Sequence, residues 1–455
     1  MKKRDEISRV SEIKSRFLAR AVSLILCFFV FFFVMPSSVV AQVEVPEHVS
    51  KLVDSVKDAF QGLKDGIKVG RVEIHPGFTV ELEYDDNIFL EADQTFANGT
   101  SEGKSEDVII TLIPSIDIQR ARGLGEFFGF GVSYRALDEN FIDITTEDAT
   151  EHDVRGEVEF GGAGGRAEMT IAGRYFDTVD PASSEFASNF NPRAEREDAR
   201  IGGDGSWEFS PLFTLEGGAE YRSNTYKEAI FQTEDSENVK ASGGFFWKWT
   251  PITSFGVRGS YRAIMYDNPG TINTDSDTYT ATGVVKWAPT ALVSGEVGVG
   301  YESRNFDTAP VPDFGREDRD DVRVDVNLNY RYTDRTRFAL YVSRTVEDSS
   351  FQSIDAFVKT ALKFSWFQDW RRKIKSEVSF DYQNHDYNES GVDIPAGGVI
   401  KDREDDRIAG EISVEYLIQE WLKTDVYYRY RQNFSNFDAK DYENNRVGIV
   451  LSAIF

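Results

Sequence analysis

Long stretches of this sequence alternate strictly between apolar and polar side chains. Between residues 321 and 332 the apolar set is Val322, Val324, Val326, Leu328, Tyr330 and Tyr332, and the polar set is Asp321, Arg323, Asp325, Asn327, Asn329 and Arg331. Successive side chains of a β-strand point to opposite faces, so a strand of this kind has one apolar face and one charged face. The runs 212–224, 373–382 and 407–416 follow the same rule.

The length of these runs separates a membrane barrel from a soluble sandwich. Sandwich strands also alternate, but they average only about five or six residues. A tilted transmembrane strand needs about nine to eleven residues, and the runs here reach that length. Eighteen strand candidates begin near residues 76, 106, 125, 150, 165, 195, 212, 236, 252, 275, 291, 317, 336, 353, 373, 402, 421 and 441. We therefore predict an all-β fold: a closed antiparallel transmembrane up-and-down β-barrel of about 18 strands, within a range of 16–18.

The connections between the candidates alternate in length. Short turns such as Ser210–Pro211 and Thr250–Pro251 follow even-numbered strands, whereas longer polar loops such as 86–105 and 179–194 follow most odd-numbered ones. Bacterial barrels have short periplasmic turns and longer extracellular loops. Aromatic residues gather near both ends of the strands, as the two lipid–water interfaces favour. Both patterns predict a barrel with its two termini in the periplasm.

The N-terminus predicts export from the cytoplasm. Seven Lys and Arg residues precede an apolar run from Ala21 to Val34, and Val39 and Ala41 fit the small positions before a signal-peptidase site. We expect a signal peptide over 1–41 and export through the Sec pathway; the alternative is an uncleaved membrane anchor. The one cysteine, Cys27, lies in this leader, so the remaining chain has no thiol for disulfides or Cys-based zinc sites.

Beyond the leader the chain divides into two parts. Apolar residues at helical spacing, from Val49 to Leu63, predict a short amphipathic helix, so we assign 42–70 to a periplasmic helix and linker and 71–455 to the outer-membrane β-barrel. Without residues 1–41 the chain has 44 basic and 74 acidic residues. Such an excess of negative charge disfavours nucleic acid as a partner, because phosphates need basic side chains.

The last strand carries an assembly pattern. Its apolar residues occupy every second position and end on the final residue: Val447, Ile449, Leu451, Ala453 and Phe455. This arrangement resembles the signal that the barrel assembly machinery reads in outer-membrane proteins. We therefore expect that machinery as a partner, together with outer-membrane lipid and lipopolysaccharide.

The charged faces of the strands predict the lining of a pore. Lipid offers no hydrogen-bonding groups, so we expect these faces to point inward, onto water. The candidates for the lumen are Arg323, Arg331, Lys359, Lys363, Lys373, Lys375, Arg429, Arg431, Glu411 and Glu415. Across residues 320–431 all the charges expected to point inward together have a modest basic excess, which would favour an anionic solute. The alternative is that the same residues form ion pairs that brace the wall.

A family resemblance rests on the opening of the first strand. Tyr84-Asp85-Asp86-Asn87-Ile88-Phe89, followed by Asp107-Val108-Ile109-Ile110-Thr111-Leu112-Ile113-Pro114, resembles the start of the β-barrel porin 2 family of outer-membrane proteins, often associated with exopolysaccharide export. The resemblance implies an outer-membrane barrel over about 70–455 and a role in moving surface polysaccharide. It implies no catalytic residues.

Two functions from different classes follow. The first is an outer-membrane pore for polar solutes, such as sugars or an exported polysaccharide. The second is a structural or adhesive barrel with a plugged lumen and functional extracellular loops. We expect no enzyme, cofactor or metal site: His385 beside Asp386 is the best candidate base, but no nucleophile motif accompanies it, and the acidic clusters near 317–321 and 402–406 lack calcium-loop spacing.

Overall fold

The computed structural model describes most of the predicted barrel. The described residues are 66–91, 94–95, 101–102, 104–121, 126–161, 165–179, 194–229, 231–267, 275–307, 318–348, 356–393, 399–437 and 440–455. The predicted signal peptide (1–41) lies outside them, as does the helix predicted within 42–70. Among the residues that the structure describes, no helix is long and apolar enough to cross a membrane.

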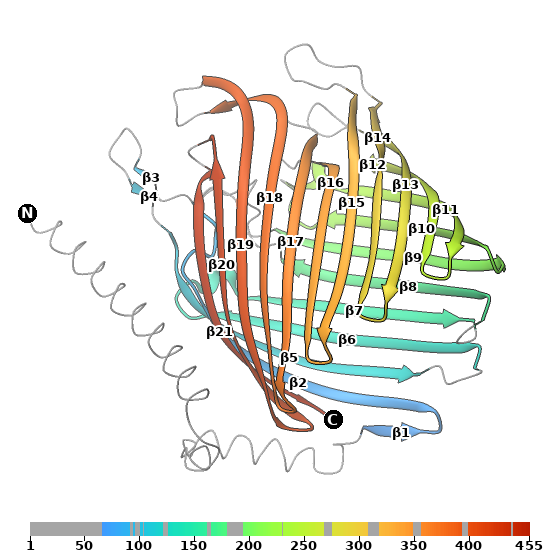
Figure 1. Ribbon diagram of the computed structural model, residues 1–455. Coiled ribbons are helices and arrows are strands. Elements are labelled where there is room, and N and C mark those ends of the chain that lie inside the picture. Colours follow the sequence, from blue (N-terminus) through green and yellow to red (C-terminus); the bar gives the residue numbers. More distant parts are fainter. Residues whose placement is uncertain are drawn as a thin grey trace, which may run out of the picture. The chain divides into compact units, whose positions relative to one another are not determined.

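Eighteen strands form one closed antiparallel barrel, which confirms the predicted fold class and strand number (Figure 1). Each strand pairs with its neighbours in the chain, and β2 pairs with β21 to close the ring. The strands are β2 (Val72–Asp85), β5 (Asp107–Arg120), β6 (Phe128–Phe141), β7 (Ala149–Phe160), β8 (Ala167–Val179), β9 (Glu195–Ser210), β10 (Phe213–Tyr226), β11 (Ser236–Thr250), β12 (Thr253–Tyr266), β13 (Ser276–Thr290), β14 (Val293–Phe306), β15 (Arg319–Thr333), β16 (Thr336–Asp348), β17 (Ala356–Arg371), β18 (Ile374–Asp393), β19 (Val399–Gln419), β20 (Leu422–Ser435) and β21 (Tyr442–Ile454).

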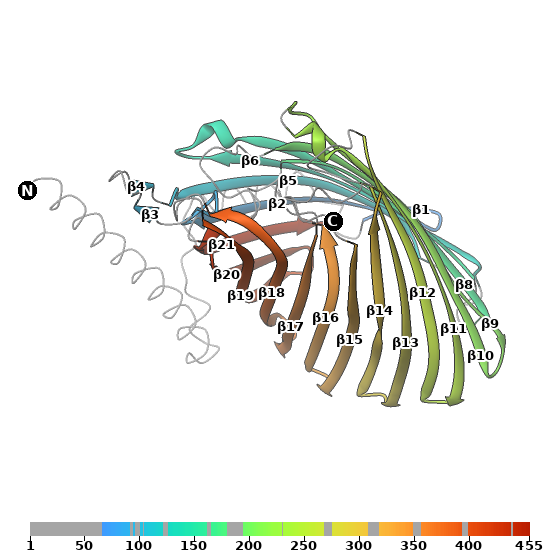
Figure 2. The same cartoon turned by 90° about the horizontal axis from the view of Figure 1, so that it is seen from above.

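Smaller elements accompany the barrel. The strand β1 (Ile67–Val69) forms a hairpin with the start of β2, and β3 (Gln94–Thr95) pairs with β4 (Ser101–Glu102). Two 3-10 turns, η2 (Thr145–Glu147) and η3 (Gln232–Glu234), lie in loops. Seen from above, the wall runs from β2 through β6, β12 and β16 round to β21 (Figure 2).

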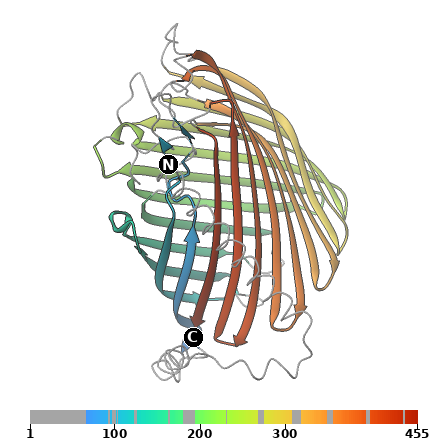
Figure 3. The same cartoon turned by 90° about the vertical axis from the view of Figure 1, so that its left-hand side faces the viewer.

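The two ends of the barrel differ, as the connection lengths predict. Two-residue turns join β9 to β10, β11 to β12, β13 to β14 and β15 to β16 at one end, and short turns of this kind are typical of the periplasmic end of bacterial barrels. The chain terminus lies at the same end. There the Phe455 ring stacks on Trp421 at 5.5 Å, and the Phe455 N–H donates to the Pro76 carbonyl oxygen at 3.0 Å. These contacts fix the last residue beside β2 at the closing seam (Figure 3).

One face of the wall is apolar and exposed. On β15 the side chains of Val322, Tyr330 and Tyr332 are 50%, 42% and 61% exposed. Near the turn end the rings of Phe209, Phe213 and Phe245 stack in a row, with centroids 5.9 and 5.4 Å apart. Nearer the loop end Tyr261 and Tyr279 pair across β12 and β13 at 5.2 Å. Two aromatic bands with aliphatic residues between them suit the two interfaces and the hydrocarbon core of a bilayer.

The exposed apolar face generates a stability prediction. Val299 lies in the middle of β14 on this face, so Val299→Lys places a charge against lipid. We expect a loss of about 2–4 kcal/mol in the free energy of unfolding, measured by denaturant titration in phospholipid vesicles. Ser260→Lys on the other face of β12 is the control and leaves that free energy within about 1 kcal/mol. Equal losses in the two variants would contradict the assignment of the faces.

Candidate functional site

The second face of every strand carries the polar side chains, and we call it the polar face of the wall. Its residues form ion pairs across neighbouring strands. On β15 Arg323 contacts Glu302 of β14 at 2.6 Å and Asp325 of its own strand at 2.8 Å. On β19 Glu415 accepts from Lys423 of β20 at 2.9 Å and lies 3.6 Å from Lys375 of β18. Opposite charges on facing strands stabilise their pairing, so these contacts brace the wall.

A charged cluster around a buried ring reaches over five strands. Phe246 of β11 lies on the polar face, yet it is only 2% exposed. Lys286 of β13 lies over the ring at 4.0 Å from its centroid, and Arg258 of β12 lies at 5.6 Å. The two cations share two carboxylates: Arg258 contacts Glu296 of β14 at 2.7 Å and Glu216 of β10 at 3.3 Å, and Lys286 contacts both as well. A Cβ at position 256 would overlap the Phe246 ring, so the ring can lie here only because residue 256 is glycine.

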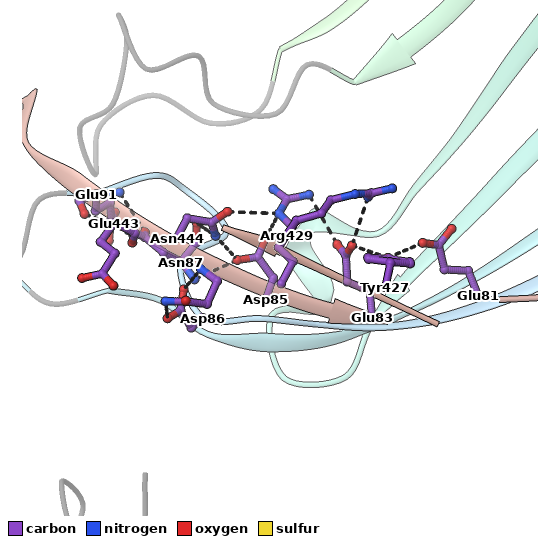
Figure 4. A network of polar contacts seen from close by, with 12 residues as sticks. Glu81, Glu83, Asp85, Asp86, Asn87, Glu91, Tyr427, Arg429, Glu443 and Asn444 are labelled. Atoms are coloured by element: carbon purple, nitrogen blue, oxygen red, sulfur yellow. Dashed lines mark hydrogen bonds and ion pairs between the residues drawn. The ribbon is translucent and has the colours of Figure 1, made fainter. Parts of the chain in front are cut away.

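A second cluster spans the closing seam (Figure 4). The Tyr427 hydroxyl of β20 donates to the carboxylates of Glu81 and Glu83 on β2, although β21 lies between the two strands. It reaches them because the intervening residue is Gly448, where a Cβ would overlap the tyrosine ring. Two cations balance Glu83, with Arg446 at 3.3 Å and Arg429 at 3.6 Å.

The loop end of the seam contains the motif that carries the family resemblance. Asp85 is 1% exposed and Asn87 is fully buried. The Asn87 side-chain amide donates to the carbonyl oxygens of Glu91 and Glu443, both at 2.9 Å. The Asn444 amide donates to the Asp85 carboxylate at 2.5 Å, and Arg446 contacts that carboxylate at 2.8 Å. The motif therefore joins the end of β2 to the start of β21 (Figure 4).

Aspartates close the hairpins at the loop end in a repeated way. Asp235, Asp275 and Asp318 stand directly before β11, β13 and β15, and each carboxylate accepts the backbone N–H of the last residue of the preceding strand. The distances are 2.7, 2.8 and 3.0 Å. Loop aspartate thus has a structural role, and among the described residues no group of three or more His, Cys, Asp or Glu is placed to hold a metal ion.

A charged pair at the loop end links the residue after β10 to β8. Lys227, just after β10, donates to the Asp177 carboxylate of β8 at 2.8 Å. This hydrogen bond raises the pKa of the Lys227 ammonium above its usual value. The pair connects two strands that are not neighbours in the barrel, because β9 lies between them.

His385, the best candidate for a base, lies on the polar face of β18. Its side chain is 3% exposed, and its ring lies 4.6 Å from the Phe357 ring. Its Nε2 atom forms a hydrogen bond with the Gln383 side chain at 3.2 Å. These are packing contacts inside a strand pair, and they do not form a catalytic arrangement.

Most of the residues predicted to line a lumen lie on the polar face of β15–β20. The register relates them directly: Glu411 faces Arg429, Lys375 faces Glu415, and Arg331 faces Arg337 of β16. Lys359 contacts Glu347 at 3.3 Å, whereas Lys363 and Arg431 form no ion pair with another described residue. Lys373 lies in the turn between β17 and β18, where it donates to the Ile418 carbonyl oxygen at 2.9 Å.

The sequence predicted a polar face over 212–224, but it did not predict the charged cluster around Phe246. Glu216, Phe246, Arg258 and Lys286 belong to different strands, and no local pattern relates them. Only the strand register brings them together, since strands β10 to β14 align side by side. A signal was present at Phe246, an aromatic residue at a position where alternation predicts a polar one.

The closed strand ring, the exposed apolar face and the ion-paired polar face define an outer-membrane β-barrel of the porin type. Residues 247–454, from the end of β11 to the end of β21, match the family model described as "Putative beta-barrel porin 2". The family resemblance expected from Tyr84–Phe89 is thereby confirmed by a separate part of the chain. The matched family consists of porins, which are channels and not enzymes. No curated protein matches the chain.

Solved porin structures resemble the chain at low identity. OccK2 (OpdF) of Pseudomonas aeruginosa is 12% identical, with a TM-score of 0.45, over 84% of this chain and 98% of its own. A BenF-like porin of Pseudomonas fluorescens Pf-5 is also 12% identical, with a TM-score of 0.43, over 84% of this chain and 99% of its own. OccK2 has also been solved in complex with glucuronate.

The seam cluster generates a second prediction. Tyr427→Phe removes the hydroxyl that donates to Glu81 and Glu83, so two neighbouring carboxylates lose a shared donor. We expect a loss of about 1–3 kcal/mol in the free energy of unfolding, again from denaturant titration in vesicles. Tyr428→Phe is the matched control, because its hydroxyl donates to the neutral Asn445 amide at 2.7 Å. A loss at Tyr427 no larger than at Tyr428 would show that the cluster does not stabilise the seam.

Proposed function

We propose that the barrel is a passive outer-membrane channel for polar solutes, with the polar face as its aqueous lining. One observation carries the proposal: the strands of a closed ring turn one face of exposed apolar side chains in one direction and one face of ion-paired side chains in the other. Only an arrangement with lipid outside and water inside satisfies both faces.

The contacts across strands support the inward direction of the polar face. Arg258 and Glu216 lie two strands apart and still meet, as do Tyr427 and Glu81. Side chains converge on the concave side of a curved sheet and diverge on the convex side, so contacts over this distance place the polar face on the inside of the ring.

The width of the ring supports an open passage, since barrels of about 16–18 strands leave an aqueous channel unless a segment plugs them.

We further propose that the solutes include sugars and the chains of an exported polysaccharide. The family resemblance implies this role. The polar face supports it chemically, because its mixed arginines and carboxylates can bind the hydroxyl and acid groups of saccharides.

Thiol labelling tests both the lining and the passage. Residues 42–455 contain no cysteine, so single cysteines can be introduced at Thr280 on the polar face and at Ala281 on the apolar face of β13. In a planar lipid bilayer we expect stepwise conductance from both variants. A charged methanethiosulfonate reagent then lowers the conductance of Thr280→Cys only, because water reaches that face alone.

The outcomes separate the two functions that the sequence leaves open. A wild-type barrel without conductance steps would contradict the channel and favour a plugged structural or adhesive barrel. Steps with equal labelling effects at both positions would contradict the assignment of the lining.

A further inference from the structure

Four arginines form a row across four adjacent strands of the polar face. Arg155 of β7 faces Arg174 of β8, Arg174 faces Arg200 of β9, and Arg200 faces Arg222 of β10. At the usual spacing of strands the row spans roughly 14 Å. Like charges at directly facing positions destabilise strand pairing, so bracing alone does not account for four in succession.

The row has fewer direct carboxylate partners than arginines. Asp153 accepts from both Arg155 and Arg174, with contacts of 2.5 and 2.8 Å. Arg200 contacts Glu220 at 2.8 Å, and Arg222 contacts Asp198. Four guanidinium groups therefore share three carboxylates. The arginine side chains are 39–58% exposed, so each can present N–H donors to the space in front of the wall.

Two further cations extend the row at its ends. Arg135 of β6 faces Asp153, and Lys240 of β11 faces Glu220. Neither forms an ion pair with another residue of the described chain. The carboxylates hold the arginines in position, and cations and carboxylates together give this part of the wall a dense, mixed charge.

A hollow lies directly beside the row. Its floor consists of small residues on neighbouring strands, Gly131, Ala172, Gly202 and Gly218, and its volume is about 660 Å³. Three arginines of the row, Arg155, Arg174 and Arg200, line the hollow on the side of the loop end. Glu157 and Asp204 also line it, so the hollow offers acceptors as well as cationic donors.

We propose that this hollow binds a segment of a carboxylated saccharide, and the proposal rests on the channel function above. The sugar carboxylates accept charge-assisted hydrogen bonds from guanidinium N–H groups that the wall carboxylates do not use, a geometry that favours arginine. The sugar hydroxyls donate to Glu157 and Asp204. The small side chains of the floor leave room for a ring against the backbone, and the row is long enough for several sugar residues.

The mixed lining selects against simpler anions. Sulfate or fully ionised phosphate has no hydroxyl donor for Glu157 and Asp204, and these carboxylates repel it. A neutral saccharide lacks the acid groups that the arginines need. The ligand must combine negative charge with hydroxyl donors, as uronic acid chains do.

Equilibrium binding to the detergent-purified barrel tests the proposal without requiring conductance. In isothermal titration calorimetry, we expect trigalacturonate to bind wild type and to bind the double variant R174Q/R200Q at least about tenfold more weakly. Maltotriose and sulfate serve as the neutral and inorganic probes and bind at least tenfold more weakly than trigalacturonate. The variant R174K/R200K retains the charge without the bidentate geometry, and we expect an intermediate affinity.

The matched control removes the same charge away from the proposed lining. R371Q/R372Q neutralises two neighbouring arginines at the end of β17 and in the turn after it, outside the hollow, and keeps the trigalacturonate affinity within about threefold of wild type. An equal loss in both double variants, or equal binding of maltotriose, would overturn the site. Absence of conductance together with selective binding would overturn the channel and leave the site in place.

Discussion

The backbone hydrogen bonds of the sheet impose the main constraint on this protein. A strand in lipid has no water to satisfy its N–H and C=O groups, so a sheet that spans the bilayer must have no open edge. Closure occurs between β2 and β21, the first and last long strands. The polar contacts of Asp85, Asn87 and Asn444, together with the Phe455 contacts, gather at this junction, where no hairpin joins the strands covalently.

Closure then determines where charge can go. Ionised groups are costly against lipid, so the proposed channel places the charged positions of each strand against water on the concave side. There the charges lie close together, and neighbours of opposite sign offset the repulsion between like charges. Glu216, Arg258, Lys286 and Glu296 form such a set, and Phe246 fills the space beneath them.

The alternation predicted all eighteen strands because period two is a local property that each strand shows by itself. The family resemblance was also local, since it depended on Tyr84–Phe89. The clusters on the polar face were not predictable, because they depend on register. Arg155, Arg174, Arg200 and Arg222 are 19, 26 and 22 residues apart in the chain, and only strand pairing aligns them. The helix within 42–70 remains a prediction.

In the channel proposed above, the ion pairs that stabilise the wall would also shape how it meets a solute. A guanidinium group that bonds one carboxylate through two of its five N–H donors still has donors for a second acceptor. Arg155 and Arg222 use Nε and one terminal nitrogen in this way, so their remaining donors face the open side. Their partners hold the side chains in one geometry and thereby lower the entropy lost when a solute binds. Bracing and recognition are therefore compatible uses of one set of residues.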